Sequence, residues 1–314
     1  MNINAKVMLA IRNFFKKYGK IILIIFIVWL GVFLVNMYLK NKPKEIKLSN
    51  TYNPDNPILD EGETVPTKIK QTANNQIDKY FNYCNIKDYA SAFSMLTDGC
   101  KEYLYNNDVN QFKEYIDEIF TTSKIYNLQN YSNTDNIYIY NMKILDDITA
   151  TGTSKGYNVY QEKIVIHDDN NELKISNQGY IGKNEIEKST EDDYMKVKVL
   201  YKNMSYAKEE YTLEIRNRTE NYLLISDNLG GDQITLNVGS QLRTALNTTN
   251  TNVIILPGEV RKITLLFDKY YDDNKTPSQI NFNNVRILGN FNGNEDKENG
   301  SQNAIKTYSL NIGI

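Results

Sequence analysis

Residues 157–181 read YNVYQEKIVIHDDNNELKISNQGYI, and this stretch decides the fold of the first half of the chain. Apolar and polar residues alternate in two runs, Tyr157–His167 and Glu172–Ile181. Alternation with a period of two is typical of half-buried β-strands. The run Asp168-Asp169-Asn170-Asn171 between them has the residues expected of a hairpin loop. The stretch therefore predicts a pair of antiparallel strands.

Two more strand patterns precede this hairpin, at Lys124–Tyr131 and Ile137–Ile148. From Pro66 to about Phe120 the apolar residues instead recur at helical spacing, and Asp108 is a good N-cap for the last of three expected helices. Helices that come before a sheet in sequence favour an α+β fold with the helices on one face. We therefore predict an α+β domain with a four-stranded antiparallel sheet over residues 66–185.

The helical stretch QIDKYFNYCNIKDYASAFSMLT, with a break at Lys87-Asp88-Tyr89, and the long strands after it resemble the nuclear transport factor 2-like superfamily. The resemblance implies a cone-shaped domain, in which a curved sheet wraps the first helix and leaves a concave pocket. Members of that superfamily use the pocket for isomerase or dehydratase chemistry, for ligand binding, or as an assembly surface. The candidate pocket residues are aromatic: Tyr80, Tyr83, Tyr89, Phe93, Tyr138, Tyr140 and Tyr160.

Residues 194–314 show only short strand patterns, separated by turn residues at the spacing of a β-sandwich. The phrase LPGEVRKITLLF, residues 256–267, resembles a late strand of the immunoglobulin-like sandwiches found on bacterial (Firmicutes-like) envelope proteins. The cysteine pair and core tryptophan of antibody domains are missing. We expect the acidic run in residues 186–193 to be a linker between the two domains, and residues 290–302 to form a protruding loop.

The N-terminal region contains the strongest membrane signal. Residues 21–39 read IILIIFIVWLGVFLVNMYL, an uncharged run long enough to span a bilayer. A basic leader, residues 1–20, precedes it, and a polar stalk, residues 40–65, follows. The run is too long for a cleaved signal peptide and lacks a small-residue exit, so it predicts an uncleaved signal-anchor. We expect a single pass through the plasma membrane, with the leader in the cytoplasm and residues 40–314 extracytoplasmic.

Charge and cysteine content exclude some functions and leave one question open. The net charge is −2, but the first 59 residues are basic and the remainder is acidic, which disfavours nucleic-acid binding. The two cysteines, Cys84 and Cys100, have no metal-binding spacing. They could form a disulfide on an oxidising side of the membrane, or remain two buried thiols.

No pattern in the chain indicates a catalytic residue, a metal site or a cofactor. His167 lies beside Asp168 and Asp169, but neighbouring residues on a strand point to opposite faces. Asp146 or Asp147 with a tyrosine hydroxyl would reproduce the acid–base pair of isomerase-like relatives, although the spacing selects no particular tyrosine.

Three functions follow from this layout. The first is a non-enzymatic binding or scaffold protein of the cell envelope, with a protein partner and an open question of homo-oligomerisation. The second is a bitopic subunit of a secretion or conjugation apparatus, because the inner-membrane subunits of type IV secretion systems have a similar order of leader, span and outer domain. The third is a small-molecule binding protein or isomerase-like enzyme that uses the cone pocket.

Overall fold

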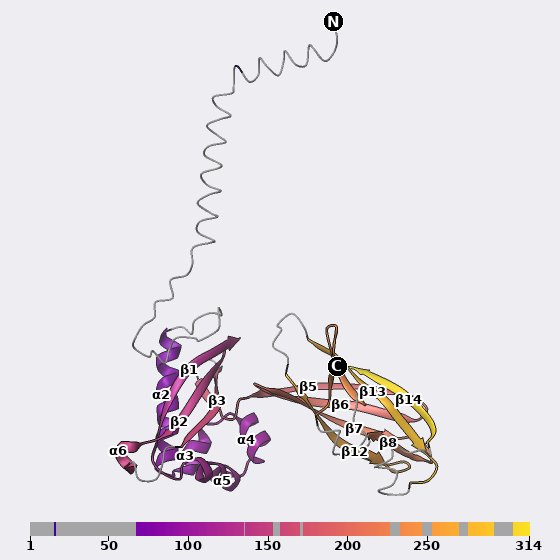
Figure 1. Cartoon of the computed structure of the whole chain (residues 1–314), viewed down its shortest axis with the longest axis horizontal. Helices are drawn as coiled ribbons and strands as arrows, with labels where there is room; N and C mark the ends of the chain where they lie inside the picture. The colour runs from indigo at the N-terminus through magenta and orange to yellow at the C-terminus, as the bar shows by residue number, and fades with distance from the viewer. Residues whose placement is uncertain are drawn as a thin grey trace. The chain divides into compact units, whose positions relative to one another are not determined.

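A computed structural model describes the chain at residues 16, 67–134, 136–152, 158–169, 172–226, 233–246, 253–269, 276–291 and 304–314. Within these residues the fold is α+β and mostly β, with antiparallel sheets, as the sequence predicts (Figure 1). The predicted membrane span at residues 21–39 and most of the predicted loop at residues 290–302 lie outside them. None of the helices described is long and apolar enough to cross a membrane.

Four helices precede the first strand, one more than predicted. They are α2 (Thr67–Asn85), α3 (Tyr89–Ser94), α4 (Asp98–Tyr105) and α5 (Val109–Ile119). The predicted N-cap is confirmed, because the Asp108 side chain accepts a hydrogen bond from Asn110 N at 2.8 Å at the start of α5. The additional helix is α4, which Thr97 caps by accepting from Cys100 N at 3.2 Å.

The first sheet is antiparallel, in the order β1-β2-β3-β4. Its strands are β1 (Lys124–Thr134), β2 (Ile137–Asp146), β3 (Val159–Asp169) and β4 (Glu172–Ser176), with the short helix α6 (Ile148–Thr151) between β2 and β3. The hairpin of residues 157–181 is confirmed as the β3–β4 pair. The predicted strand Glu172–Ile181 is nevertheless broken, because Gln178 and Gly179 have φ of 52° and 71° and turn the chain.

The helices pack on one face of this sheet. Alternate residues of β2 and β3, among them Tyr140, Met142, Ile164 and Ile166, face them and are buried. Ile77 of α2 and Phe112 and Ile116 of α5 close the same core, each with 0% exposure. The two periods predicted from sequence, helical and then alternating, therefore meet in one hydrophobic core.

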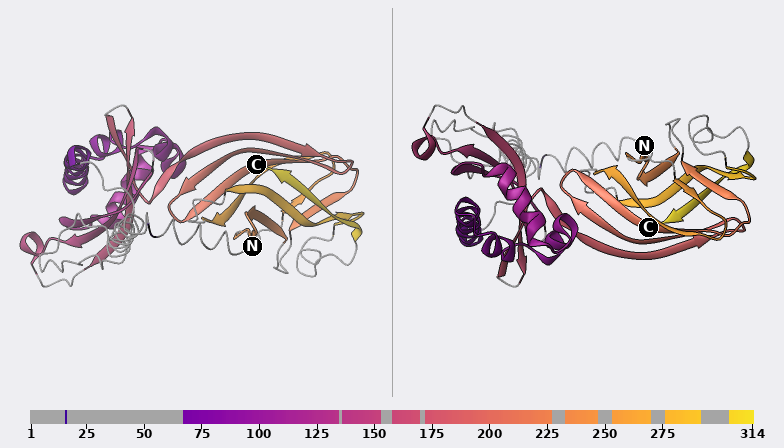
Figure 2. Two further views of the ribbon diagram at one scale, coloured as in Figure 1. Left: turned by 90° about the horizontal axis from the view of Figure 1, so that it is seen from above. Right: turned by 90° about the horizontal axis from the view of Figure 1, so that it is seen from below.

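The rest of the chain forms two further antiparallel sheets that enclose a second core (Figure 2). One sheet has the order β12-β7-β6-β5, and in the other β10, β9, β13, β8 and β11 follow one another while β14 pairs with β13. The strands are β5 (Tyr180–Glu191), β6 (Met195–Ser205), β7 (Lys208–Asn217), β8 (Tyr222–Ser226), β9 (Ile234–Val238), β10 (Gln241–Thr244), β11 (Val253–Ile255), β12 (Val260–Asp268), β13 (Pro277–Leu288) and β14 (Ala304–Gly313).

Strand β5 contributes to both cores. Its first residue, Tyr180, is 2% exposed in the core under the helices, whereas Ile186 packs against the core between the two later sheets. Residues 186–191, expected to be a linker, are therefore the second half of a strand paired with β6. A bulge between Glu185 and Lys188, with Glu187 at a φ of 53°, bends β5 there.

Candidate functional site

The seven aromatic residues predicted to line a pocket lie at different depths in the first part of the protein. Tyr80, Tyr138 and Tyr140 are 2%, 7% and 3% exposed and belong to the first core. Tyr83, Tyr89 and Phe93 are partly buried and pack against that core. Tyr160, at 39% exposure, lies toward the surface. Six of the seven rings therefore belong to the first core or pack against it.

A polar cluster lies at the margin of this core, centred on the half-buried Glu162 of β3. The Tyr115 hydroxyl donates to Glu162 Oε2 at 2.6 Å, and Gln178 N donates to the same oxygen at 3.3 Å. Nearby, Asn177 Nδ2 donates to the Tyr105 hydroxyl at 2.7 Å and Cys100 Sγ donates to Asn177 Oδ1 at 3.3 Å. Burial raises the pKa of Glu162 to about 7, although the bond from Tyr115 opposes this shift.

Sequence reasoning missed Glu162, although the sequence contains a signal for it. Glu162 shares the alternation of Ile164 and Ile166, both fully buried on the helix side of the sheet. A carboxylate in an apolar register of a strand is the kind of group whose pKa is displaced toward neutrality. Such a carboxyl beside a tyrosine hydroxyl has the chemistry of a general acid–base pair.

The carboxylates considered from sequence have structural roles instead. Asp146 Oδ1 lies 2.5 Å from Lys124 Nζ, and their side chains are 8% and 6% exposed. Thr122 Oγ1 and Asn158 N also donate to Asp146, at 2.7 and 2.9 Å. The pKa of Asp146 is held well below its usual range, chiefly by the bond from Lys124. Asp147 accepts from Thr149 N at 3.0 Å at the start of α6.

His167 lies on β3 and faces Ser176 of β4. Its Nε2 lies 3.2 Å from Ser176 Oγ on the neighbouring strand, and burial lowers the pKa of the ring. Among the described residues, no group of three or more His, Cys, Asp or Glu side chains is placed to hold a metal ion.

The two cysteines are free and buried, so the structure contains no Cys84–Cys100 disulfide. Cys84 lies on α2 and Cys100 on α4, each with 0% exposure. Burial raises the pKa of both thiols to about 12. Because the thiolate is the reactive form, both side chains are chemically inert in the folded protein.

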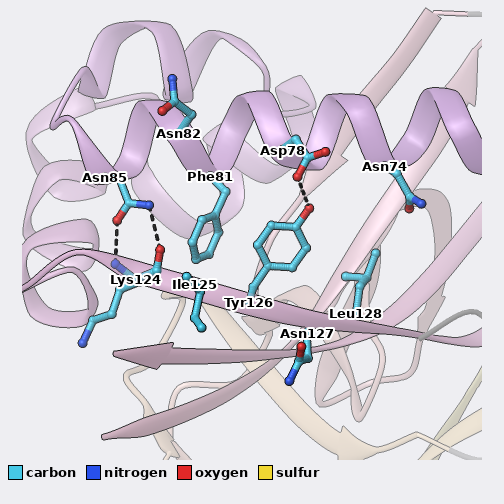
Figure 3. Close-up of a pocket in the computed structure, with 10 residues that line it drawn as sticks. All are labelled: Asn74, Asp78, Phe81, Asn82, Asn85, Lys124, Ile125, Tyr126, Asn127 and Leu128. Carbon is cyan, nitrogen blue, oxygen red and sulfur yellow. Dashed lines mark hydrogen bonds between the residues drawn. The ribbon is translucent and has the colours of Figure 1, made fainter. Parts of the chain in front are cut away.

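An accessible groove of about 460 Å³ lies between α2 and β1 (Figure 3). The Tyr126 side chain crosses it, and its hydroxyl donates to Asp78 Oδ1 at 2.5 Å. Phe81 packs on Tyr126 with ring centroids 4.7 Å apart. The groove is lined by Asn74, Asp78, Phe81, Asn82 and Asn85 of α2 and by Lys124, Ile125, Tyr126, Asn127 and Leu128 of β1.

At one end of the groove, Asn85 replaces a neighbouring strand. Its Nδ2 donates to Lys124 O and its Oδ1 accepts from Lys124 N, both at 2.9 Å (Figure 3). One side-chain amide thus satisfies the backbone donor and the backbone acceptor of a strand residue. No protein-family model matches the chain, and no curated protein sequence matches it significantly.

Proposed function

We propose that this chain is a non-enzymatic binding or scaffold protein of the bacterial cell envelope. In this proposal residues 21–39 anchor it in the plasma membrane and the described residues from 67 onward lie outside. The first part would be a nuclear transport factor 2-like cone and the second an immunoglobulin-like sandwich. The helices-then-sheet order and the paired sheets around the second core support those two classes.

The observation that carries the proposal is the burial of the predicted pocket residues in the first core. Tyr80, Tyr138 and Tyr140 are each at most 7% exposed, where an enzyme of the cone type would present such side chains to an open cavity. The groove between α2 and β1 instead lies at the edge of the sheet, where a macromolecule can reach it. Buried aromatic rings and an accessible sheet edge fit a protein that binds proteins.

In-cell chemical crosslinking of the full-length chain, followed by mass spectrometry of the crosslinked peptides, tests this function. We expect a reproducible set of envelope proteins joined to residues of the described part. Recovery of the chain alone, at crosslinker concentrations that join a known envelope complex in the same cells, would contradict a scaffold role. Partners confined to one export machine would favour the secretion or conjugation subunit.

One observation favours an enzyme as the second candidate: Glu162 and the Tyr115 hydroxyl form an acid–base pair at 2.6 Å. Catalysis would require the surrounding side chains to part and admit a substrate. Loss of an enzymatic activity in both the Glu162→Gln and the Tyr115→Phe variants, with folding retained, would support this candidate over the scaffold.

A further inference from the structure

The two edges of the first sheet are protected to different extents. At β4, residues 95–97 lie alongside the strand: Thr97 N donates to Ile175 O at 2.8 Å, and Ile175 N donates to Met95 O at 3.0 Å. This outer edge is therefore paired by the chain itself. Natural sheets usually protect their edges, because an unpaired strand is a template for another strand.

At the opposite edge, β1 is the terminal strand of the sheet and Asn85 covers only its first residue. In an antiparallel ladder, the N–H and C=O groups of alternate residues point to the same side. Since the groups of Lys124 point toward Asn85, those of Tyr126 and Leu128 also point away from β2. Within the described residues, no segment pairs with β1 on this side.

The groove beside this edge has a defined chemistry. The partly buried Tyr126 presents aromatic surface and packs on Phe81, which is buried, while Asn74 and Asn82 present amides that can donate or accept. Asp78 is exposed and is the acidic group of the lining, whereas the Lys124 ammonium is already paired with Asp146. The accessible charge of the groove is therefore negative.

We propose that the β1 edge binds an extended segment of another polypeptide, which adds as a strand beside Tyr126 and Leu128 and places a lysine or arginine near Asp78. The inference rests on the proposed binding function and names its site and the chemistry of its partner. Backbone hydrogen bonds would supply the pairing, and the groove would select side chains at alternate positions of the bound segment. Asn85 would mark one end, because it already occupies the backbone groups of Lys124.

Hydrogen exchange of the full-length chain, resolved to single amides, tests the site. The probe is an acetylated heptapeptide of alternating threonine and valine with one central lysine. We expect exchange at the Tyr126 and Leu128 amides to slow at least about tenfold at saturation, since pairing closes these donors to water. Exchange at Ile125 and Asn127, which already face β2, should not change.

Three results would overturn the inference. Unchanged exchange at Tyr126 and Leu128 would show that no strand is added. Equal slowing across residues 124–128 would indicate general stabilisation by binding elsewhere. Slowing that rises with the concentration of the protein alone would assign the edge to a second copy of this chain.

The Asp78→Asn variant tests the charge preference, because its amide oxygen still accepts from the Tyr126 hydroxyl. A second peptide with glutamate in place of the central lysine serves as the comparison. In Asp78→Asn we expect the affinity for the lysine peptide to fall roughly threefold, the size of an exposed charge pair, so that the two peptides bind with equal affinity. Glu114→Gln on α5 neutralises an equally exposed helical carboxylate and should leave both affinities unchanged. Equal losses in the two variants, or none in Asp78→Asn, would contradict the role of Asp78.

These outcomes separate the inference from the function on which it rests. Crosslinked partners in cells together with an unprotected β1 edge would leave the scaffold function standing and refute this site. A protected β1 edge without crosslinked partners in cells would support this site and contradict the scaffold function.

Discussion

The buried polar side chains of the protein are of two kinds, ionisable and uncharged. The first part holds ionisable ones in or against its core, namely Glu162 with Tyr115 and the pair Lys124–Asp146. The second part also buries one carboxylate, Glu209, against the Tyr211 hydroxyl, but the end of β7 is held by an uncharged residue, Asn217, which is 0% exposed. Asn217 Nδ2 donates to the carbonyls of Asn221, Ile255 and Leu256 at 2.6, 3.1 and 3.0 Å.

This difference determines which buried groups make the stability of the protein depend on pH. Ionisable groups that are buried or paired make stability depend on pH, because their pKa values differ between the folded and unfolded chain. An amide bonded to backbone carbonyls has no such dependence. The first part should therefore be sensitive to pH, while the arrangement around Asn217 should not.

The largest expected effect is on the buried ion pair. Asp146→Ala leaves the Lys124 ammonium without its partner and should lower the free energy of unfolding by about 3–5 kcal/mol. Urea unfolding followed by circular dichroism measures this loss. Asp147→Ala, one residue further on, removes only a contact at the start of a four-residue helix and should cost less than about 1 kcal/mol. Similar losses in the two variants would remove the distinction between a core charge and a surface charge.

Glu162 gives the next largest effect, and its sign is fixed by its pKa. The folded pKa of about 7 lies above the ordinary value of 4.5, so the folded chain holds the proton that the unfolded chain releases between these values. Stability should therefore fall as pH rises from about 5 to 8. Glu162→Gln removes this dependence and should stabilise the protein at pH 8 by up to about 3 kcal/mol, with little change at pH 5.

Thermal and urea unfolding at both pH values check this prediction. Glu118→Gln, an exposed carboxylate on α5, is the matched control and should shift stability equally little at both. A Glu162→Gln effect of the same size at pH 5 and pH 8 would show that the carboxyl is not desolvated.

The Asn217→Ala variant tests the uncharged buried group of the second part. It removes the bonds to three carbonyls and the acceptor of the Thr219 N–H. The loss should be about 2 kcal/mol, since Leu256 O still accepts from Glu259 N and Asn221 O still accepts from Thr219 Oγ1. The loss should be equal at pH 5 and pH 8, in contrast to Glu162→Gln. Asn184→Ala, at an exposed position of β5, should be nearly neutral. A pH-dependent loss in Asn217→Ala would contradict the contrast between the two parts.

The smallest effect concerns the thiols. Cys84 and Cys100 are fully buried with pKa values near 12, so a membrane-impermeant maleimide should leave the folded protein unlabelled at pH 7. Because the native cysteines stay unlabelled, an added cysteine can report membrane topology. A cysteine that replaces the exposed Asn127 should be labelled on intact cells if the described part is extracytoplasmic. Labelling that requires lysed cells would place it inside.

Much of the secondary structure could be predicted, because it follows local patterns. Alternation identified β1 to β4 and most strands of the second part, and Asp108 marked the start of α5. Helix α4 was missed, because Thr97-Asp98-Gly99 also has the residues of a turn. Strand β5 was missed because Lys183–Glu185 and Glu187–Ser189 are exposed and polar, which leaves no apolar alternation to read.

The candidate sites were less predictable, because they depend on contacts between distant residues. Glu162 required the knowledge that α5 covers its face of the sheet, so that Tyr115 meets it. The groove required β1 to be the terminal strand and Asn85 to reach it from α2. Six of the seven aromatic residues chosen from sequence belong to one core or pack against it, but the sequence pattern could not show whether they line a cavity or fill it.

Strand β5 also has a genetic consequence. A recombination point at the turn of residues 177–179 would separate Tyr180 from the core under the helices, and one after Glu191 would take a strand from β6. Neither position leaves both halves whole. The two halves should therefore be inherited together, consistent with the described residues from 67 onward belonging to one compact unit.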